Sequence, residues 1–468
     1  MTRRLIVVSN RLPLVLTREG AEWRMRPATG GLVTALAPVL AAESGLWIGW
    51  PGTKEEPAVA EQLRSASEET SYGLEPVFLT AEERSRFYLG FSNEIIWPLF
   101  HDLQSRCNFD PAYWGSYLTV NRKFAAIMTA QASDDSLFWV HDYHLMEVAR
   151  FLREQHTAAR TAFFLHIPFP PPDIYAKLPW RDQILKSLLE FDLLGFQTQR
   201  DQRNFLQCVR GLVRDATLGH DGRYLAVRRN GHRARVGFFP ISIDFRTFTE
   251  QASEPQVADR AARIRVEQKD CQIVLGVDRL DYTKGIPERL KAFRNLLARF
   301  PDLHRKIVLV QVAVPSRSDI PRYRELKTEI ERLVSEINGQ YTQSGWVPIH
   351  YLYRSLSRRE LLAYYRAASI ALITPLKDGM NLVAKEYCAA QVEHEGALIL
   401  SEFAGAAAEL KRGALLVNPY DSEGVADAIH RAFTMDLAER HRRMLTLRQI
   451  IRRADIFHWA SSFLRAAD

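Results

Sequence analysis

Short apolar runs alternate with helical patterns along this chain, and this alternation restricts the fold more than any other feature. In the first half, strand-like runs lie at Leu5 to Val8, Phe138 to Val140, Ala162 to His166 and Leu193 to Gln197. Helical patterns such as Leu185 to Glu190 separate them. Alternating strands and helices indicate a parallel sheet. The first half therefore predicts a doubly wound α/β domain.

A second alternating series follows a pause in the pattern near Phe238 to Asp244 and a polar helical stretch at Gln251 to Lys269. Its strands are all apolar, which predicts burial on both faces of a sheet; they are Gln272 to Val277, Lys306 to Val314, Ser369 to Thr374, Ala397 to Leu400 and Ala414 to Val417. We therefore expect two Rossmann-like doubly wound domains that face each other, residues 1–243 and 244–449. We also expect the amphipathic segment at 450–468 to pack back on the first domain.

Composition excludes several classes of protein. The 468 residues carry a formal net charge of +7 that is spread along the chain, without an aromatic and basic nucleic-acid motif. The four cysteines form no CxxC pair, so they indicate neither a zinc site nor a disulfide framework, and they fit a reducing cytoplasm. The apolar run at the N-terminus is too short for a signal peptide or a membrane span. We expect a cytoplasmic protein with no metal and no membrane or nucleic-acid partner.

The stretch from Ala371 to Tyr387 predicts a buried strand, a polar turn and a helix that starts near Asn381. Ligands of parallel α/β sheets bind at such junctions, and first-turn amides can hold a diphosphate. The amides concerned belong to Gly379, Met380, Asn381, Leu382 and Val383. Carboxylates accept hydrogen bonds from sugar or ribose hydroxyls, which are the natural partners of Asp378 and Glu386 there. The simpler alternative is a capping aspartate and a solvated glutamate.

Two cations follow the first strand of the second series. Arg279 and Lys284 lie in the loop at its carboxyl end, where two positive charges suit a diphosphate. Solvated side chains are the alternative for such a pair. Because the loop and the stretch near Asp378 both follow parallel strands, together they favour a site.

The first half offers weaker signals. Gly30 and Gly31 precede a helical pattern and make a second candidate anion loop, although it matches no Walker or GxGxxG fingerprint. Histidines follow two strands, in the stretches from His141 to His144 and from His166 to Pro172. Their spacing matches no metal site, and hydroxyl binding or a buried structural histidine are both compatible with it. Tyr88 and Trp97 suit either a sugar face or the core.

Taken together, these motifs resemble the trehalose-6-phosphate synthase family over about residues 5 to 465. The resemblance rests on eight motifs in one order: Ser9-Asn-Arg11, Gly30-Gly31, Tyr88 with Trp97, His141-Asp-Tyr-His144, His166-Ile-Pro-Phe-Pro170, Arg279-Leu-Asp-Tyr-Thr-Lys284, Ser316-Arg317 and Asp378-Gly-Met-Asn-Leu-Val-Ala-Lys-Glu386. It implies a metal-independent, retaining glycosyltransferase of the GT-B type that joins a nucleotide-activated glucose, most simply UDP-glucose, to glucose 6-phosphate.

The resemblance also implies roles for single residues. Arg279, Lys284 and the amides from Gly379 to Val383 would hold the donor diphosphate, and Glu386 the ribose. Asp378 and His166 would bind the transferred glucose, while Gly30 and Gly31 let their loop approach the donor. The acceptor would be held by Arg11, Trp50, Tyr88, Trp97, Asp142 and Arg317. The residues that the resemblance assigns to catalysis are Asp142, His166, Arg279, Lys284 and Asp378.

Three alternatives stay open from the sequence. A glucosylglycerol-phosphate synthase would keep the donor motifs and use glycerol 3-phosphate. A pseudo-sugar synthase or a catalytically silent sensor of sugar phosphates would lack some of these groups, which are all present here. The donor base (uridine, guanosine or adenosine) and a homo-oligomeric state, dimer or tetramer, are left open.

Overall fold

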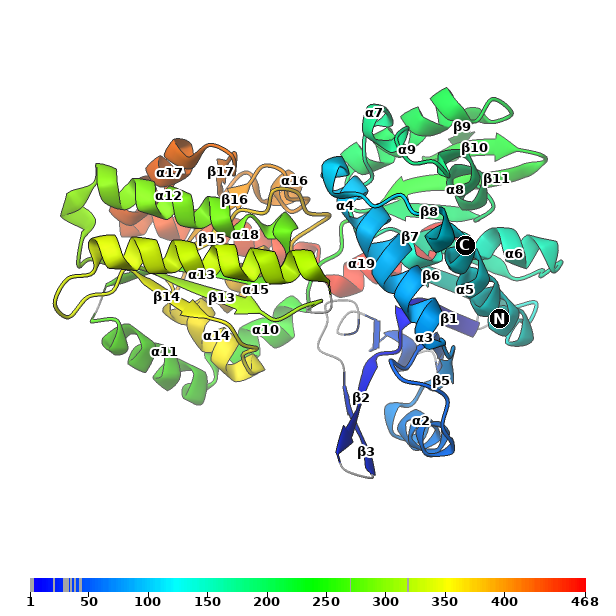
Figure 1. Cartoon of the computed structure of the whole chain (residues 1–468), viewed down its shortest axis with the longest axis horizontal. Coiled ribbons are helices and arrows are strands. Elements are labelled where there is room, and N and C mark those ends of the chain that lie inside the picture. Colours follow the sequence, from blue (N-terminus) through cyan, green and yellow to red (C-terminus); the bar gives the residue numbers. More distant parts are fainter. Residues whose placement is uncertain are drawn as a thin grey trace. The chain divides into compact units, whose positions relative to one another are not determined.

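A computed structural model describes residues 4–19, 22–27, 33, 36–37, 39–41, 44–269, 271–317 and 320–468 of the chain (Figure 1). The chain forms two compact units. Unit 1 consists of Met1–Pro240 together with Phe457–Asp468, and unit 2 of Ile241–Ile456. The chain therefore passes from one unit to the other twice, after Pro240 and after Ile456.

Unit 1 is built on a nine-stranded sheet with the order β5-β4-β1-β6-β7-β8-β11-β10-β9. The first seven strands in this order, from β5 to β11, pair in parallel. The central strand β6 is buried along its whole length. The strands are β1 (Arg4–Arg11), β4 (Leu46–Trp50), β5 (Gly73–Pro76), β6 (Ser136–His141), β7 (Arg160–Phe164), β8 (Leu193–Phe196), β9 (Thr217–Asp221), β10 (Tyr224–Arg229) and β11 (His232–Phe238). A separate hairpin joins β2 (Leu14–Glu19) to β3 (Glu22–Pro27).

One edge of this sheet differs from the parallel arrangement that the sequence predicts. Strands β9, β10 and β11 pair antiparallel. The turn between β10 and β11 is Asn230-Gly231, and both residues have positive φ, 49° and 78°. Asn-Gly is the strongest short-range signal of a hairpin, because such turns need positive φ at both central positions. The alternation of strands and helices hides this signal, which is purely local.

Helices of unit 1 cover its sheet, and the last helix of the chain is one of them (red in Figure 1). Rings on α19 pack on rings of the sheet, with Phe463 stacked on Trp139 at 4.6 Å between centroids. The helices are α2 (Pro57–Thr70), α3 (Ala81–Glu83), the π-helix η1 (Arg84–Ile96), α4 (Trp97–Phe100), η2 (Gln104–Arg106), α5 (Pro111–Ala130), η3 (Tyr143–Leu145), α6 (Val148–Glu154), α7 (Pro172–Tyr175), α8 (Arg181–Leu188), α9 (Gln199–Leu212) and α19 (Ile456–Ala467).

Unit 2 has a six-stranded sheet that is parallel throughout, with the order β14-β13-β12-β15-β16-β17. The apolar runs β15 and β16 are wholly buried, as strands covered on both faces must be, whereas the edge strand β14 is only partly buried. The strands are β12 (Gln272–Arg279), β13 (Ile307–Val314), β14 (Ile349–Leu352), β15 (Ile370–Ile373), β16 (Ala397–Ser401) and β17 (Leu415–Val417).

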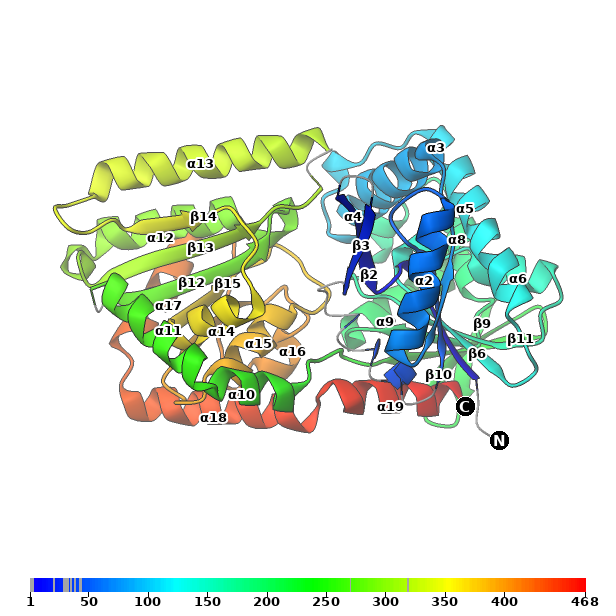
Figure 2. The ribbon, with the colours of Figure 1, turned by 90° about the horizontal axis from the view of Figure 1, so that it is seen from below.

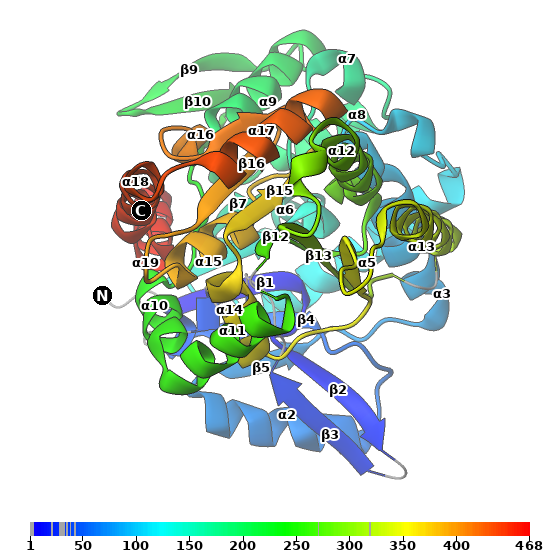
Figure 3. The ribbon, with the colours of Figure 1, turned by 90° about the vertical axis from the view of Figure 1, so that its left-hand side faces the viewer.

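The helices of unit 2 form two layers, one on each face of the sheet (Figures 2 and 3). One layer contains α12 (Ile286–Arg299), α13 (Pro321–Tyr341) and α17 (Ser422–Thr434). The other contains α10 (Phe245–Ser253), α11 (Pro255–Glu267), α14 (Arg358–Ala367), α15 (Leu382–Ala390) and α18 (Leu437–Arg453). Short helices occur at η4 (Tyr282–Lys284), η5 (Pro301–Leu303) and α16 (Ala407–Leu410).

Two segments that read as single helices in the sequence are each broken. The polar stretch from Gln251 to Lys269 divides between α10 and α11, because Pro255 supplies the first residue of α11 and Glu254 before it is not helical. The segment at 450–468 divides between α18 and α19, and the amide of Ile456 bonds to the carbonyl of Ile243 instead of continuing a helix. Hydrophobic periodicity locates helices better than it locates their ends.

The four cysteines are all free thiols, and three of them are buried. Within the described ranges, no helix is both long and apolar enough to cross a membrane.

Candidate active site

In unit 2 the loops after β12 and β15 bring the predicted donor residues together. The Lys284 ammonium lies 2.5 Å from Oδ2 of Asp378, and the Asn381 side-chain amide donates to the same oxygen at 3.1 Å. The backbone joins the two loops as well, since the amide of Leu376 bonds to the carbonyl of Thr283 at 2.8 Å. These contacts confirm that residues almost a hundred positions apart in sequence share one edge of the sheet.

A buried aspartate organises the cations of this edge. Burial raises the pKa of Asp281, but the positive charges of Arg317, Arg279 and Lys284 outweigh it and hold this pKa below its usual value. The Arg317 guanidinium lies 3.4 Å from Asp281 Oδ2 and donates to the Tyr323 hydroxyl at 2.8 Å. Three cations and two carboxylates, Asp281 and Asp378, thus meet at this edge, which leaves one net positive charge where an anion can bind.

The helix that the sequence predicts near Asn381 is α15, with Asn381 as its N-cap. Asn381 has φ 82° and caps the helix by accepting a hydrogen bond from the amide of Ala384. The amides of Leu382 and Val383 belong to the first turn, where no carbonyl within the helix can accept from them. Gly405 allows the close packing of the preceding turn, because a Cβ there would lie 1.9 Å from the carbonyl oxygen of Gly379. Gly379 and Met380 are buried in this turn.

Glu386 lies one turn further along α15. It accepts a hydrogen bond from the Tyr365 hydroxyl at 2.9 Å. Burial raises the pKa of Glu386, and the Tyr365 hydroxyl and the Arg358 charge act in the opposite direction. A carboxylate in this setting has a spare oxygen that can accept from a further hydroxyl.

A buried ion pair underneath fixes the ends of these strands. Arg289 of α12 lies 2.5 Å from Asp278 near the end of β12, and both side chains are almost fully buried. Arg289 also donates to Gln311 on β13 at 2.9 Å and to the hydroxyl of Thr374 after β15 at 3.1 Å. One guanidinium therefore connects three neighbouring strands directly below the loops.

In unit 1 an aromatic and basic cluster follows β1 and β4. The Arg11 guanidinium lies 4.2 Å from the centroid of the Trp50 ring, and the Trp50 ring meets Tyr88 edge-on at 6.3 Å. Tyr88, carried by the π-helix η1, stacks on His144 at 5.8 Å. Gly52 makes room for this arrangement, because it has φ 91° and a Cβ on it would meet the Arg11 guanidinium at 2.0 Å. π-helices are rare and occur frequently at functional sites.

Asp142 and His166 lie at the carboxyl ends of β6 and β7, as the sequence predicts. The backbone amide of His166 donates to Asp142 Oδ1 at 3.2 Å. The His166 ring hydrogen-bonds through Nε2 to Nδ1 of His141 at 3.1 Å. Burial lowers the pKa of His166 to about 3, and burial together with His166 lowers the pKa of His141 well below its usual value. Both rings are therefore neutral at pH 7, and one N–H donates a hydrogen bond to the other ring.

The remaining predicted residues of unit 1 divide into two groups. Trp97, at the start of α4, is 6% exposed and packs on His101 and Tyr143, so most of its ring serves the core. Gly30 and Gly31 lie outside the described residues.

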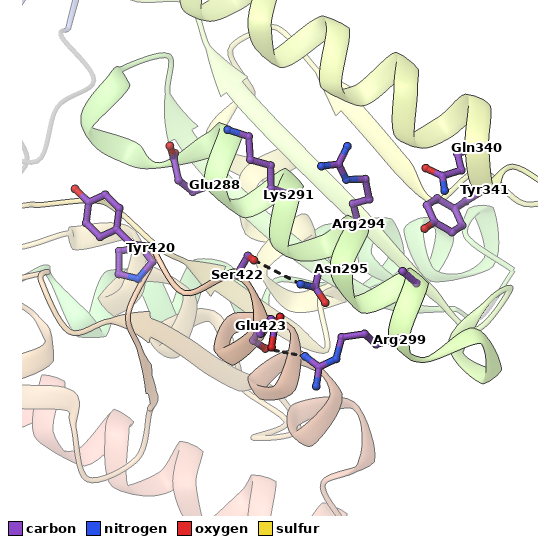
Figure 4. A pocket seen from close by; sticks show the side chains of 12 residues that line it. Glu288, Lys291, Arg294, Asn295, Arg299, Gln340, Tyr341, Tyr420, Ser422 and Glu423 are labelled. Carbon is purple, nitrogen blue, oxygen red and sulfur yellow. Dashed lines mark hydrogen bonds between the residues drawn. The ribbon is translucent and has the colours of Figure 1, made fainter.

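A cavity of about 800 Å³ on unit 2 lies apart from all of these residues (Figure 4). Lys291, Arg294 and Arg299 project from α12 along it, and the opposite wall carries Tyr420 and Glu423. None of the predicted site residues lines this cavity.

Metal-binding side chains do not gather in the described part of the chain: no group of three or more histidine, cysteine, aspartate or glutamate side chains there is arranged to hold an ion.

Two Rossmann-like units, one with cations gathered at a helix start and one with neutral histidines and a stacked aromatic cluster, define a glycosyltransferase of the GT-B class. The chain belongs to glycosyltransferase family 20, whose family model matches residues 3–468. It is 44% identical over 469 residues to the trehalose-6-phosphate synthase of Mycolicibacterium paratuberculosis (strain ATCC BAA-968 / K-10), covering 98% of this chain and 94% of that protein.

Solved structures also match this chain over almost its whole length. A structure described as trehalose-6-phosphate from E. coli bound with UDP-2-fluoro glucose has a TM-score of 0.88 and 37% identity, covering 99% of this chain and 98% of that one. A UDP-forming α,α-trehalose-phosphate synthase from Burkholderia xenovorans, in complex with glucose-6-phosphate, has a TM-score of 0.88 and 33% identity, covering 99% of both chains.

Several residues of these clusters have only a weak signal in the sequence, or none. Asp281 stands within the run from Arg279 to Lys284, but a carboxylate between cations reads as their solvated partner. Gly52 follows a tryptophan and a proline, which is a local turn signal without any indication of Arg11. Tyr117 and Asn121, which contact the loop after β6, lie within a helical pattern that gives no hint of a site.

Proposed function

We propose that this protein transfers glucose from UDP-glucose to glucose 6-phosphate with retention of configuration, giving α,α-trehalose 6-phosphate and UDP. The observation that carries the proposal is the gathering of Arg279, Lys284 and Arg317 at the edge of the unit 2 sheet, beside the start of α15. Positive charge beside a helix start suits a sugar diphosphate. Relatives named for this activity match almost the whole chain.

In unit 2 we assign the donor. Arg279, Lys284 and the amides of Leu382 and Val383 hold its diphosphate, and Glu386 holds the ribose. Two observations support these roles: Arg279 is exposed at the end of its strand, and Lys284 is partly exposed. Asp378 binds hydroxyls of the transferred glucose.

In unit 1 we assign the acceptor sugar phosphate to the cluster around Trp50. Arg11 binds the phosphate, and Tyr88 and Asp142 contact the sugar, with Trp97 supporting them from the core. Arg317 is a further proposed ligand of the acceptor phosphate, the role that the resemblance implies for it. The neutral ring of His166 fits a role as a hydrogen-bond partner of glucose hydroxyls, because its bond to His141 through Nε2 fixes the orientation of the ring.

The chemistry follows from the charges. Cleavage of the glycosyl diphosphate bond builds negative charge on the leaving UDP, and fixed cations stabilise that charge in the transition state. We assign no protein nucleophile: the acceptor hydroxyl attacks from the face that UDP leaves, and the leaving phosphate accepts its proton. Catalysis then rests on positioning and electrostatics, without a metal or an organic cofactor. The free thiols support a reducing, cytoplasmic location.

The test is an assay of the purified chain with UDP-glucose and glucose 6-phosphate in the presence of EDTA. We expect UDP and a product whose mass and NMR couplings are those of α,α-trehalose 6-phosphate. Activity that EDTA abolishes and a divalent ion restores would contradict the metal-independent route. Product formed only from glycerol 3-phosphate would assign the chain to the glucosylglycerol-phosphate synthases instead.

A further inference from the structure

The loop that follows β6 has an unusual backbone. Asp142 has φ 76° and ψ 167°, a conformation that is essentially restricted to glycine. Such conformations are unfavourable by about 1 to 3 kcal/mol and persist only where the surroundings hold them. The loop from Asp142 to Glu147 must therefore be held by contacts outside itself.

Asp142 itself is bonded to the carbonyl of Phe164 at 2.8 Å and to the amide of His166, and two side chains of α5 hold the rest of the loop. The Tyr117 hydroxyl donates to the carbonyl of Tyr143 at 2.8 Å and accepts from the amide of Met146 at 3.0 Å. The Asn121 amide group donates to the carbonyl of His144 at 3.0 Å, and its oxygen accepts from the amide of Glu147 at 3.1 Å. Four backbone groups of the loop are thus bonded to two side chains of one helix.

The geometry makes this contact rigid. Tyr117 and Asn121 lie four residues apart on α5, so they project from the same face, and both are 0% exposed. The Asn121 amide also donates to the carbonyl of Tyr117 at 2.9 Å, which fixes its own orientation. Burial raises the pKa of the Tyr117 phenol well above its usual value, so the hydroxyl keeps its proton. Removal of either side chain would leave buried backbone groups of the loop without a hydrogen-bond partner, which is unfavourable.

We propose that Tyr117 and Asn121 are positioning residues for glucosyl transfer: together they hold the Asp142 loop in the strained conformation that presents the Asp142 carboxylate to the acceptor sugar. The proposal rests on the proposed function, because it acts through the acceptor contact of Asp142. Both side chains are fully buried, so they act on the acceptor site through the loop that carries Asp142.

The test compares Tyr117→Phe with the matched control Tyr175→Phe. Tyr175 is also a fully buried tyrosine of unit 1, and its hydroxyl donates to a backbone carbonyl, that of Arg181, at 3.0 Å. Both variants are expected to fold and to lower the urea midpoint, Tyr117→Phe by more because it loses two hydrogen bonds and Tyr175→Phe one. Only Tyr117→Phe should lower kcat/KM for glucose 6-phosphate, by about 10- to 100-fold, as small misplacements of a reacting group do. Calorimetric binding of UDP should be unchanged in both.

A double-mutant cycle separates positioning from general damage. If Tyr117 acts through Asp142, adding Tyr117→Phe to Asp142→Asn should leave kcat/KM within about twofold of Asp142→Asn alone. Multiplied losses would overturn the proposal, and so would equal losses in Tyr117→Phe and Tyr175→Phe. Asn121→Ala should repeat the pattern of Tyr117→Phe. Failure of the wild-type chain to form trehalose 6-phosphate would contradict the proposed function, whereas a wild type that is active together with an active Tyr117→Phe would contradict this inference alone.

Discussion

Arg317 illustrates how one side chain can belong to both the fold and the site. Its guanidinium is 8% exposed and is shared between Asp281 and the Tyr323 hydroxyl, yet a guanidinium has five donors and can bind a phosphate as well. We expect Arg317→Ala to raise KM for glucose 6-phosphate by about 10- to 100-fold, since bonds to charged groups are worth about 1.5 to 3 kcal/mol. Steady-state kinetics with each substrate varied in turn measures this.

The control for Arg317 is Arg354→Ala, which removes a half-exposed arginine of the same unit that pairs with Glu360. It should leave both substrates unaffected. Binding of UDP, followed by calorimetry, should change little in Arg317→Ala. Equal losses for the donor and the acceptor would show that Arg317 mainly holds Asp281 in place and has no acceptor role.

Glu147 is a buried carboxyl group outside the catalytic set. Its side chain is 0% exposed, and burial raises its pKa to about 8, although the Arg150 charge opposes this shift. The folded protein therefore keeps a proton on Glu147 that the unfolded chain releases near pH 4.5. The contribution of Glu147 to the free energy of unfolding is fully present below pH 4.5. As the pH rises from there towards 8, this free energy falls by about 1.4 kcal/mol per pH unit.

We expect Glu147→Gln to remove this part of the pH dependence, because the amide is neutral at every pH. The measurement is the free energy of unfolding in urea at several pH values between 5 and 8, for the wild type and the variant. Glu82→Gln, at a largely exposed position of the same unit, is the control and should keep the wild-type slope. A variant with an unchanged slope would show that Glu147 is ionised in the folded protein.

At the scale of elements, the turn into α12 depends on a single glycine. Gly285 has φ 64°, and a Cβ on it would lie 2.5 Å from the carbonyl oxygen of Thr374 after β15. Gly285→Ala should therefore destabilise unit 2 by more than about 1 kcal/mol and weaken UDP binding, because the change pushes the Lys284 loop away from β15. Thermal unfolding and calorimetry with UDP measure the two effects.

Gly339, in the last turn of α13, is the matched control. Nothing lies within 4 Å of a Cβ added there, so Gly339→Ala should stabilise the protein by about 0.5 to 1 kcal/mol. Opposite signs at the two glycines are the expected result. Stabilisation by Gly285→Ala would mean that the two loops are not packed as described.

The elements that the sequence predicts best are those whose signal is local and repeated. The apolar runs of β12, β13 and β16 are near-continuous, so their burial and parallel pairing follow from pattern alone. The edge hairpins around Asn230-Gly231 have an equally local signal that the larger alternation obscures. Helix ends at Glu254 and Ala454 depend on a proline and on a bond to Ile243, neither of which affects periodicity.

Some residues of the candidate site can be predicted from the sequence and others cannot. The proximity of Lys284 and Asp378 can be predicted, because both residues follow strands of one parallel sheet. Asp281 and Tyr117 act through buried contacts across long sequence separations. Their partners lie on other elements and are specified only by packing. A single sequence carries no periodic or spacing signal for such contacts.

At the scale of the whole molecule, unit 1 is completed by residues from the far end of the chain. Trp459 of α19 is 2% exposed and packs on Trp139 and Phe164, at 5.1 Å and 5.2 Å between ring centroids. Trp459→Ala should lower the free energy of unfolding by about 3 to 5 kcal/mol, the range for large aromatic residues in cores. Phe457→Ala, at a position 46% exposed on the same helix, should stay within about 0.5 kcal/mol of wild type. Similar losses in both variants would show that α19 contributes as a whole and not through the Trp459 ring.

The double crossing of the chain between the units also has a consequence for biosynthesis. Residues 241–456 leave the ribosome between the two parts of unit 1, so unit 2 can finish folding while unit 1 still lacks α19. At about 5 to 20 residues per second, translation of that insertion lasts on the order of ten seconds or more. During this interval the aromatic face around Trp139 has no cover from its own helix. The nascent chain is therefore most exposed to aggregation late in synthesis, and chaperones that bind aromatic surface should act on it before release.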